Sequence, residues 1–306
     1  MKGLRYGTVR SASALRSAGL QPCSRSGGAY DSAAVIGVKK PRIYNPCERM
    51  GSTLFDLTGR TAVVVGGTSG IGRMLALGLA DAGADVVATA RRQPLVDEMA
   101  REIEARGRRT LRATSDVGDR GSLDALRDAV LKALGRVDIV VCAAGITKRV
   151  PTLDMDEADW QKILDVNLTG TLRAYRAFAP AMIERKSGRL IGICSLSSYV
   201  GLFEVAAYSA SKSGVAGLTR ALAVEWARYN VTVNAIAPGV FRTELNAKLL
   251  DGPRGQEFLM RTPMKRFGKL EELVGAAVYL ASDAAAFVTG QLIAVDGGFL
   301  ASGVNQ

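Results

Sequence analysis

Residues 61–83, TAVVVGGTSGIGRMLALGLADAG, decide the fold of this chain because they join a strand to a helix through a glycine-rich turn. The opening TAVVVGG predicts a buried strand, and residues 71–83 place apolar side chains at helical spacing before a final glycine. Between them, GGTSGIG at 66–72 lets the backbone turn sharply toward the free N–H groups of the helix N-terminus. Such a turn can serve packing alone, but its place between a strand and a helix favours a site for a dinucleotide pyrophosphate.

Five further apolar runs follow, with room for helices between them, at residues 85–90, 136–145, 188–195, 230–239 and 290–298. Parallel strands need crossover connections, usually helices, which then cover both faces of the sheet. No internal repeat and no second linker interrupts the series. We therefore expect an α/β fold, a Rossmann-type doubly wound parallel sheet, in one domain over residues 50–306.

The first 49 residues differ from the rest in composition. They hold nine Lys/Arg against two Asp/Glu, a net +7 of the chain's +11, and show no sustained apolar period. We expect residues 1–49 to be a disordered basic extension. One interpretation is an organellar transit peptide, which is Arg- and Ser-rich and poor in acids. The other, which we prefer, is an upstream extension ahead of a start at Met50, because MGSTLFDLTGRTAVVVGG is typical of a domain opening.

The composition argues against several classes of protein. Residues 50–306 carry 31 Lys/Arg against 27 Asp/Glu, so the domain does not require a nucleic acid partner. The longest uncharged stretch near the middle, residues 190–203, has 14 residues, fewer than the roughly 20 apolar residues of a membrane helix. The four cysteines are far apart and histidine is absent, so we expect no structural metal, no histidine-dependent triad and a reducing, cytoplasmic setting.

Without histidine, another group must move protons in any active site. Tyr208 and Lys212 are four residues apart in a region of helical character, so both project from one face. The reference pKa of tyrosine is about 10, and a nearby ammonium lowers it by favouring the phenolate. The two residues could also form an exposed helix pair, so their surroundings decide. Ser195 ends an apolar run thirteen residues before Tyr208, and Asn167 lies in DVNLTG on the preceding helix.

Together, Asn167, Ser195, Tyr208 and Lys212 resemble the catalytic tetrad of the short-chain dehydrogenase/reductase family, and the resemblance covers nearly all of residues 54–300. It implies that Tyr208 donates or takes the hydroxyl proton, while Lys212 lowers its pKa and holds the nicotinamide ribose. It also implies that Ser195 hydrogen-bonds the reacting oxygen and that Asn167 positions a water in the proton relay.

The match to the family pattern is incomplete at two motifs. A Thr usually precedes the first glycine of the turn, where this chain has Val65, and the family's N-N-A-G after the fourth strand is CAAG at 142–145. Both changes replace polar groups by small or apolar ones. In the serine loop, Ser197 and Ser198 are rivals of Ser195, which the thirteen-residue spacing to the tyrosine selects.

The end of the second apolar run bears on the cofactor. An acidic residue there would accept the ribose 2′-hydroxyl of NAD, but ATARRQ places Ala90 at that position and Arg91 and Arg92 after it. Arginines can pair with a 2′-phosphate through their guanidinium forks, or they can be solvated surface cations. We expect NADP in preference to NAD. The resemblance implies further cofactor contacts from Gly66, Ser69, Gly70, Ile71, Gly72, Asp116, Val117, Ala143, Ala144, Gly145, Tyr208, Lys212, Pro238, Gly239, Val240 and Thr243.

The substrate is set by loops that these motifs do not specify. AGITKRVP, the ICSLSS serine loop and the GGFLASGV ending resemble gluconate 5-dehydrogenases and related ketogluconate reductases. Lys148 and Arg149 could pair with a sugar-acid carboxylate or be solvated loop cations, and Ser195 and Tyr208 would also meet the substrate. We expect an NADP(H)-dependent oxidoreductase acting on a carbonyl or secondary alcohol, and the resemblance implies a homotetramer. The alternatives are a 3-oxoacyl thioester reductase and a non-catalytic cofactor-binding regulator.

Overall fold

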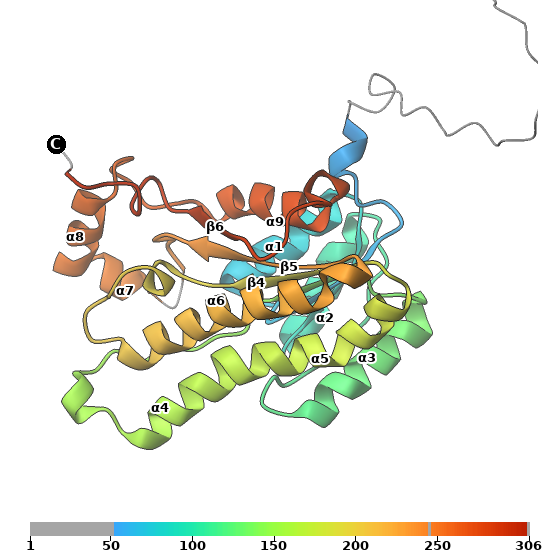
Figure 1. The fold of residues 1–306 in the computed structure, drawn as a ribbon, viewed down its shortest axis with the longest axis horizontal. Helices are drawn as coiled ribbons and strands as arrows, with labels where there is room; N and C mark the ends of the chain where they lie inside the picture. The colour runs from blue at the N-terminus through green and yellow to red at the C-terminus, as the bar shows by residue number, and fades with distance from the viewer. Residues whose placement is uncertain (1–51, 244–245, 305–306) are drawn as a thin grey trace, which may run out of the picture. The chain divides into compact units, whose positions relative to one another are not determined.

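The apolar runs form the strands of one parallel sheet in the computed structural model, which describes residues 52–243 and 246–304 (Figure 1). In chain order the strands are β1 Thr61–Val65, β2 Asp85–Thr89, β3 Ile139–Cys142, β4 Gly188–Ile193, β5 Val231–Pro238 and β6 Leu292–Val295. Their order across the sheet is β2-β1-β3-β4-β5-β6, so the direction of winding reverses between β1 and β3. This is the doubly wound arrangement that the sequence predicts. The expectations for residues 1–49 and for a start at Met50 lie outside the described residues.

Helices connect the strands and cover both faces of the sheet. They are α1 Gly70–Asp81, α2 Gln93–Ala105, α3 Arg120–Leu134, α4 Glu157–Leu164, α5 Gly170–Glu184, α6 Ala206–Trp226, α7 Ala247–Leu250, α8 Pro253–Arg261 and α9 Val274–Ala281. A π-helical turn, η4 (Asp165–Thr169), joins α4 to α5. Short 3-10 turns include η3 (Thr152–Asp154) and η5 (Leu196–Ser198).

The two faces of the sheet bury different helices. Side chains of α1, α2 and α9 pack on one face, and those of α3, α5 and α6 pack on the other. Alternate strand residues serve the two cores, so that Val64 joins the first cluster while Val63 and Val65 join the second. Because both faces are covered, the strands are apolar along their length instead of alternating with polar residues.

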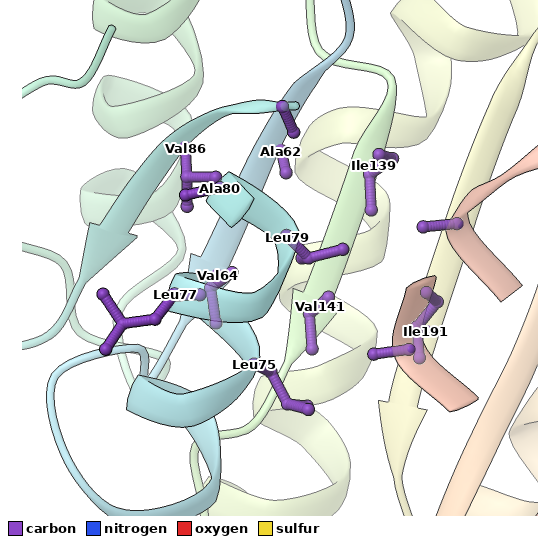
Figure 2. Packing of buried hydrophobic residues seen from close by; sticks show 14 of the residues in the cluster. Ala62, Val64, Leu75, Leu77, Leu79, Ala80, Val86, Ile139, Val141 and Ile191 are labelled. Atoms are coloured by element: carbon purple, nitrogen blue, oxygen red, sulfur yellow. The ribbon is translucent and has the colours of Figure 1, made fainter. Parts of the chain in front are cut away.

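Helix α1 positions the glycine-rich turn by packing across the middle of the sheet. Figure 2 shows Leu75 and Leu79 of α1 among Val64 of β1 and Ile139 and Val141 of β3, all of them buried. Burying each such aliphatic side chain contributes about 1.5–3 kcal/mol. This packing holds the N-terminus of α1 at the carboxyl end of β1.

The sheet has one strand fewer before CAAG than the family that the sequence resembles. Residues 109–115 run beside β2, where the N–H of Val86 donates to the carbonyl of Arg109 (3.1 Å) and the N–H of Ser115 donates to that of Ala90 (3.1 Å). These bonds lie near the two ends of the stretch, and it is not assigned as a strand. The strand that precedes CAAG, counted as the fourth in the family, is therefore β3 here.

Within residues 52–243 and 246–304, none of the helices is long and apolar enough to cross a lipid bilayer. The same residues contain no cluster of three or more cysteine, aspartate or glutamate side chains that could hold a metal ion.

Candidate active site

The carboxyl ends of β1 and β3 meet at the glycine-rich turn. The N–H groups of Ala143 and Ala144 both donate to the carbonyl of Val65, at 2.8 and 3.1 Å. Gly66 has a φ of +79°, and a Cβ at this position would lie 2.5 Å from the backbone nitrogen of Ala144. Glycine is therefore required where the two turns touch. This contact marks the point of winding reversal, where doubly wound folds bind nucleotides.

The turn leaves space above the N-terminus of α1. A Cβ on Gly70 would have only the methyl group of Thr243 within 4 Å among the described residues, at 3.8 Å, whereas one on Gly72 would collide with the backbone of the turn itself. Ser69 is the N-cap residue, yet its side chain makes no capping hydrogen bond, and the first turn of α1 carries no acidic residue. Ile71 packs against the core below. The free N–H groups and the helix dipole therefore fit a diphosphate.

Two arginines lie just beyond the carboxyl end of β2. Arg91 and Arg92 are both exposed, and neither side chain makes a hydrogen bond or ion pair within the described part of the chain. At the other end of the strand, by contrast, the guanidinium of Arg109 lies 2.7 Å from the carboxylate of Asp85. Both arginines are thus available to an anion, and Ala90 places no carboxylate at the end of β2 to repel one.

The loop carrying Asp116 and Val117 is held beside β2. The carboxylate of Asp116 accepts the backbone N–H two residues further on (2.8 Å), and the carbonyl of Val117 accepts a hydrogen bond from Arg173 (3.2 Å). The bond between Ser115 and Ala90 ties the loop to the end of the strand. Their predicted place beside the adenine stays a prediction.

Helix α6 carries Tyr208 and Lys212 one turn apart, as the sequence predicts. The Lys212 Nζ lies 5.7 Å from the centroid of the Tyr208 ring and donates to the carbonyl of Ile193 at the end of β4 (2.7 Å). A Cβ on Gly145 would lie 3.5 Å from this Nζ and 3.4 Å from Oδ1 of Asn167. The hydroxyl of Tyr208 makes no hydrogen bond to any described residue. The ammonium has further N–H donors, so both groups can meet a ligand.

Asn167 lies in the π-helical turn η4 and is fully buried. Its Oδ1 accepts the N–H of Ile146 (2.8 Å), while its Nδ2 donates to the carbonyl of Ile146 (2.9 Å) and to Oγ of Ser211 (3.0 Å). The Ser211 hydroxyl in turn donates to the carbonyl of Tyr208 (2.7 Å). The amide therefore ties the loop after β3 to the catalytic helix. The predicted role in positioning a water stays a prediction.

The three serines after β4 occupy different settings. Ser195 is half-buried, and its Oγ accepts the N–H of Ser197 (3.2 Å). Ser197 is buried, and its own Oγ has no hydrogen-bond partner in the described structure. The Ser198 hydroxyl donates to the carbonyl of Lys212 (2.9 Å). The hydroxyl proton of Ser198 is already donated to the backbone of α6. This geometry therefore favours Ser195 as the serine that can donate to a ligand.

The motif after β5 closes the other side of the glycine-rich turn. Pro238 is the last residue of β5, and a Cβ on Gly239 would lie 2.6 Å from the Cα of Asp296. The carbonyl of Val240 accepts a backbone hydrogen bond (2.9 Å), and the N–H of Thr243 donates to a side-chain amide three residues further on (2.8 Å). The methyl of Thr243 lies 3.8 Å from the position that a Cβ on Gly70 would take. The predicted contacts of Gly239, Val240 and Thr243 with the cofactor stay predictions.

The two predicted substrate cations are each paired with an acidic residue. Lys148 donates a hydrogen bond to Asp159 of α4, which raises the pKa of Lys148. The Nε of Arg149 donates to Glu204 (2.6 Å), in the segment before α6. A substrate carboxylate that binds Lys148 or Arg149 would therefore share that cation with its acidic partner in the protein, Asp159 or Glu204. The structure therefore leaves their role in binding substrate a prediction.

Sequence reasoning missed two residues that contact these groups: Ser211 and Glu204. Ser211 links Asn167 to the carbonyl of Tyr208, and its position between Tyr208 and Lys212 was an available signal. Glu204 gave no comparable signal, because a single charged residue in a loop is usually solvated.

A family model described as Enoyl-(Acyl carrier protein) reductase matches residues 65–300. The 2-dehydro-3-deoxy-D-gluconate 5-dehydrogenase of Escherichia coli K12 is 41% identical over 249 residues, which are 81% of this chain and 98% of that protein. The chain belongs to the short-chain dehydrogenase/reductase family. The 5-keto-D-gluconate 5-reductase of the same strain is 39% identical over 251 residues, covering 81% of this chain and 98% of that protein.

A solved member of the short-chain dehydrogenase/reductase family has the same fold. It is a gluconate 5-dehydrogenase from Burkholderia cenocepacia J2315 in complex with NADP and tartrate, with a TM-score of 0.80 and 38% identity, covering 82% of this chain and 99% of that one. The chain is thus an oxidoreductase of the short-chain family. The alternative of a non-catalytic regulator has no support among these relatives.

Proposed function

We propose that this chain is an NADP(H)-dependent reductase and dehydrogenase that interconverts the ketone and the secondary alcohol at carbon 5 of a six-carbon sugar acid, as in 5-ketogluconate and gluconate. The observation that carries the proposal is the convergence of Tyr208, Lys212 and Asn167 at the carboxyl ends of β3 and β4, next to a turn that fits a diphosphate.

The exposed, unpaired side chains after β2 favour NADP(H) as the cofactor. Arg91 and Arg92 can pair with the 2′-phosphate, and the N-terminus of α1 can bind the diphosphate. The relative from Burkholderia cenocepacia holds NADP in its structure. When bound, the nicotinamide supplies or accepts the hydride, and Lys212 can reach its ribose with the N–H donors that Ile193 leaves free.

The proton step belongs to the protein. In the reducing direction, the hydroxyl of Tyr208 donates a proton to the carbonyl oxygen while Ser195 donates a hydrogen bond to the same oxygen. The ammonium of Lys212 stabilises the resulting phenolate across the short distance to the Tyr208 ring, 5.7 Å from Nζ to the centroid. Asn167 keeps the loop after β3 in place through both bonds to Ile146.

The names of the relatives support a sugar acid. Two relatives are named for reactions at carbon 5 of a gluconate derivative, and the solved relative holds tartrate, a hydroxy acid with two carboxylates. The cations Lys148 and Arg149 lie in the loop that follows Gly145, so they are our proposed contacts for the carboxylate.

The test is the consumption of NADPH with matched ketones: 5-keto-D-gluconate, L-sorbose and an acetoacetyl thioester. L-Sorbose has a hydroxymethyl group where 5-keto-D-gluconate has its carboxylate, so the pair isolates the effect of charge. We expect kcat/KM for 5-keto-D-gluconate to exceed that for L-sorbose by at least about tenfold, the effect of one charge-assisted hydrogen bond. Faster turnover of the thioester than of the sugar acid would instead assign the chain to 3-oxoacyl reduction.

We also propose a homotetramer in the cytoplasm. Val224, on the outer side of α6, is 83% exposed, and Phe287 after the last helix is fully exposed, so both offer apolar surface to further copies. Light scattering coupled to size-exclusion chromatography should give four times the chain mass of 32.3 kDa. A monomer at micromolar concentration would contradict the tetramer.

A further inference from the structure

Ser211 is a buried residue of α6 whose hydroxyl contacts two groups of the candidate active site. The residue has no exposed surface, and its hydroxyl donates to the carbonyl of Tyr208 (2.7 Å). Because its single proton is committed to that carbonyl, the oxygen can only accept from Nδ2 of Asn167, which lies 3.0 Å away. The hydrogen bonds therefore run in one direction, from the amide of Asn167 through Ser211 to the backbone of Tyr208.

The other side of the Asn167 amide is fixed on the loop after β3. Its Oδ1 accepts the N–H of Ile146 (2.8 Å), and its Nδ2 donates to the carbonyl of the same residue (2.9 Å). These two partners cannot exchange places, so they set which way the amide points. Ile146 follows Gly145, where a Cβ would lie 3.5 Å from Nζ of Lys212. Ser211 therefore connects a loop that faces the lysine with the helix that carries the tyrosine.

A close apolar contact holds the same face of α6 against the π-helical turn η4. Gly214 lies three residues after Ser211, on the same side of the helix, and a Cβ there would lie 2.7 Å from a methyl group of Leu168. Leu168 follows Asn167 in η4, so a polar and an apolar contact join the same two elements side by side. Because Ser211 is fully buried in this contact, solvent does not compete for its two hydrogen bonds.

Thr219, the other fully buried hydroxyl residue of α6, lacks such a contact. Its hydroxyl donates to the carbonyl of Val215, four residues earlier on the same helix (2.8 Å). Serine and threonine commonly make this bond to their own helix. In the described part of the chain, no side chain of another element donates to the hydroxyl of Thr219. The bond from Asn167 to Ser211 is therefore more than the local satisfaction of a buried hydroxyl.

We propose that Ser211 is a positioning residue for the proton transfer and that it acts through Asn167. Its hydroxyl holds the start of α6 at one place against the loop after β3, so that the hydroxyl of Tyr208 and the ammonium of Lys212 meet the reacting oxygen in a single geometry. Ser211 itself exchanges no proton with the substrate, because its proton stays on the carbonyl of Tyr208. This inference rests on the proposed function, since it assumes that Tyr208 gives the proton, but it applies to any ketone that the chain reduces.

The first test uses the full chain with NADPH and whichever of the three ketones named above it reduces fastest. We expect Ser211→Ala to lower kcat by about tenfold, a part of the roughly 100-fold that a misplacement of about 1 Å can cost. The KM for the ketone and the dissociation constant of NADPH should change little, because Lys212 keeps its bond to Ile193. Thr219→Val is the matched control: it removes a buried hydroxyl from the same helix and should lower the melting temperature to a similar extent while leaving kcat unchanged.

The second test asks whether Ser211 acts through Asn167. If it does, the double variant Ser211→Ala, Asn167→Ala should have the same kcat as Asn167→Ala alone, because the connection is already broken. A further loss as large as that of Ser211→Ala in the intact background would show that the two residues act independently and would overturn the proposal. Ser211→Thr keeps the hydroxyl and should retain most of the kcat of the intact chain.

The outcomes separate this inference from the proposed function. If the intact chain reduces the thioester or L-sorbose faster than 5-keto-D-gluconate, the substrate assignment fails, and the role of Ser211 is decided with that other ketone. If Ser211→Ala keeps the kcat of the intact chain, or loses no more of it than Thr219→Val does, the positioning role is wrong and the proposed function stands. If Ser211→Ala raises KM and leaves kcat unchanged, the hydroxyl serves substrate binding instead, and the proposal is also wrong.

Discussion

Replacing Asn167 by alanine should disable the active site and destabilise the domain together. The side chain makes three hydrogen bonds, two to the backbone of Ile146 and one to Ser211, and the residue is completely buried. With each bond contributing about 1 kcal/mol and the freed groups losing partners, we expect a loss of about 2–4 kcal/mol in the free energy of unfolding. In a domain of this size, that corresponds to a decrease of roughly 5–15 °C in the melting temperature.

Asn234 provides the matched control. It is 1% exposed and also clamps backbone groups, donating to the carbonyl of Val288 (2.8 Å) and accepting the N–H of Gln291 (3.0 Å). None of these groups belongs to the candidate active site. Asn234→Ala should therefore lower the melting temperature by a comparable amount while kcat at 25 °C stays close to that of the intact enzyme.

The effect on catalysis distinguishes the two asparagines. Without Asn167, the loop at Ile146 and the helix that carries Tyr208 lose their connection, and misplacement by about 1 Å can cost roughly 100-fold in rate. We expect kcat of Asn167→Ala to fall by about ten- to hundredfold in the NADPH assay with 5-keto-D-gluconate. Equal kcat values for the two alanine variants would show that Asn167 supports the fold and not the positioning of Tyr208.

Three further predictions concern the proton donor, the cofactor and the turn. Tyr208→Phe should retain its melting temperature and NADPH affinity but lose nearly all turnover, and near-normal turnover would overturn the proton step. Arg91→Ala should raise the dissociation constant of NADPH about tenfold with little change for NADH, as measured by fluorescence titration; equal shifts would place the phosphate elsewhere. Gly72→Ala should abolish measurable NADPH binding because its Cβ collides with the turn, whereas Gly217→Ala, with nothing within 4 Å, should bind normally and melt slightly higher.

The fold and much of the candidate site follow from local patterns. Each strand was visible as an apolar run because both faces of the sheet are buried, and the glycine-rich turn was visible because few other residues can adopt its conformations. The pairing of Tyr208 with Lys212 follows from helical spacing alone. Residues 109–115, which run beside β2 without forming an assigned strand, show no apolar pattern, since polar side chains such as Arg109 and Arg112 interrupt it.

The sequence by itself determined the order of strands and helices, the turn at the N-terminus of α1 and the set of groups that can move a proton, because these depend on spacing within a few residues. Only the tertiary structure decided which distant groups meet. Arg149 and Glu204 are 55 positions apart in the sequence, yet their side chains lie 2.6 Å apart. The segments that leave β3 and β4 bring these two charges together at one edge of the sheet, and no local pattern of residues encodes that approach.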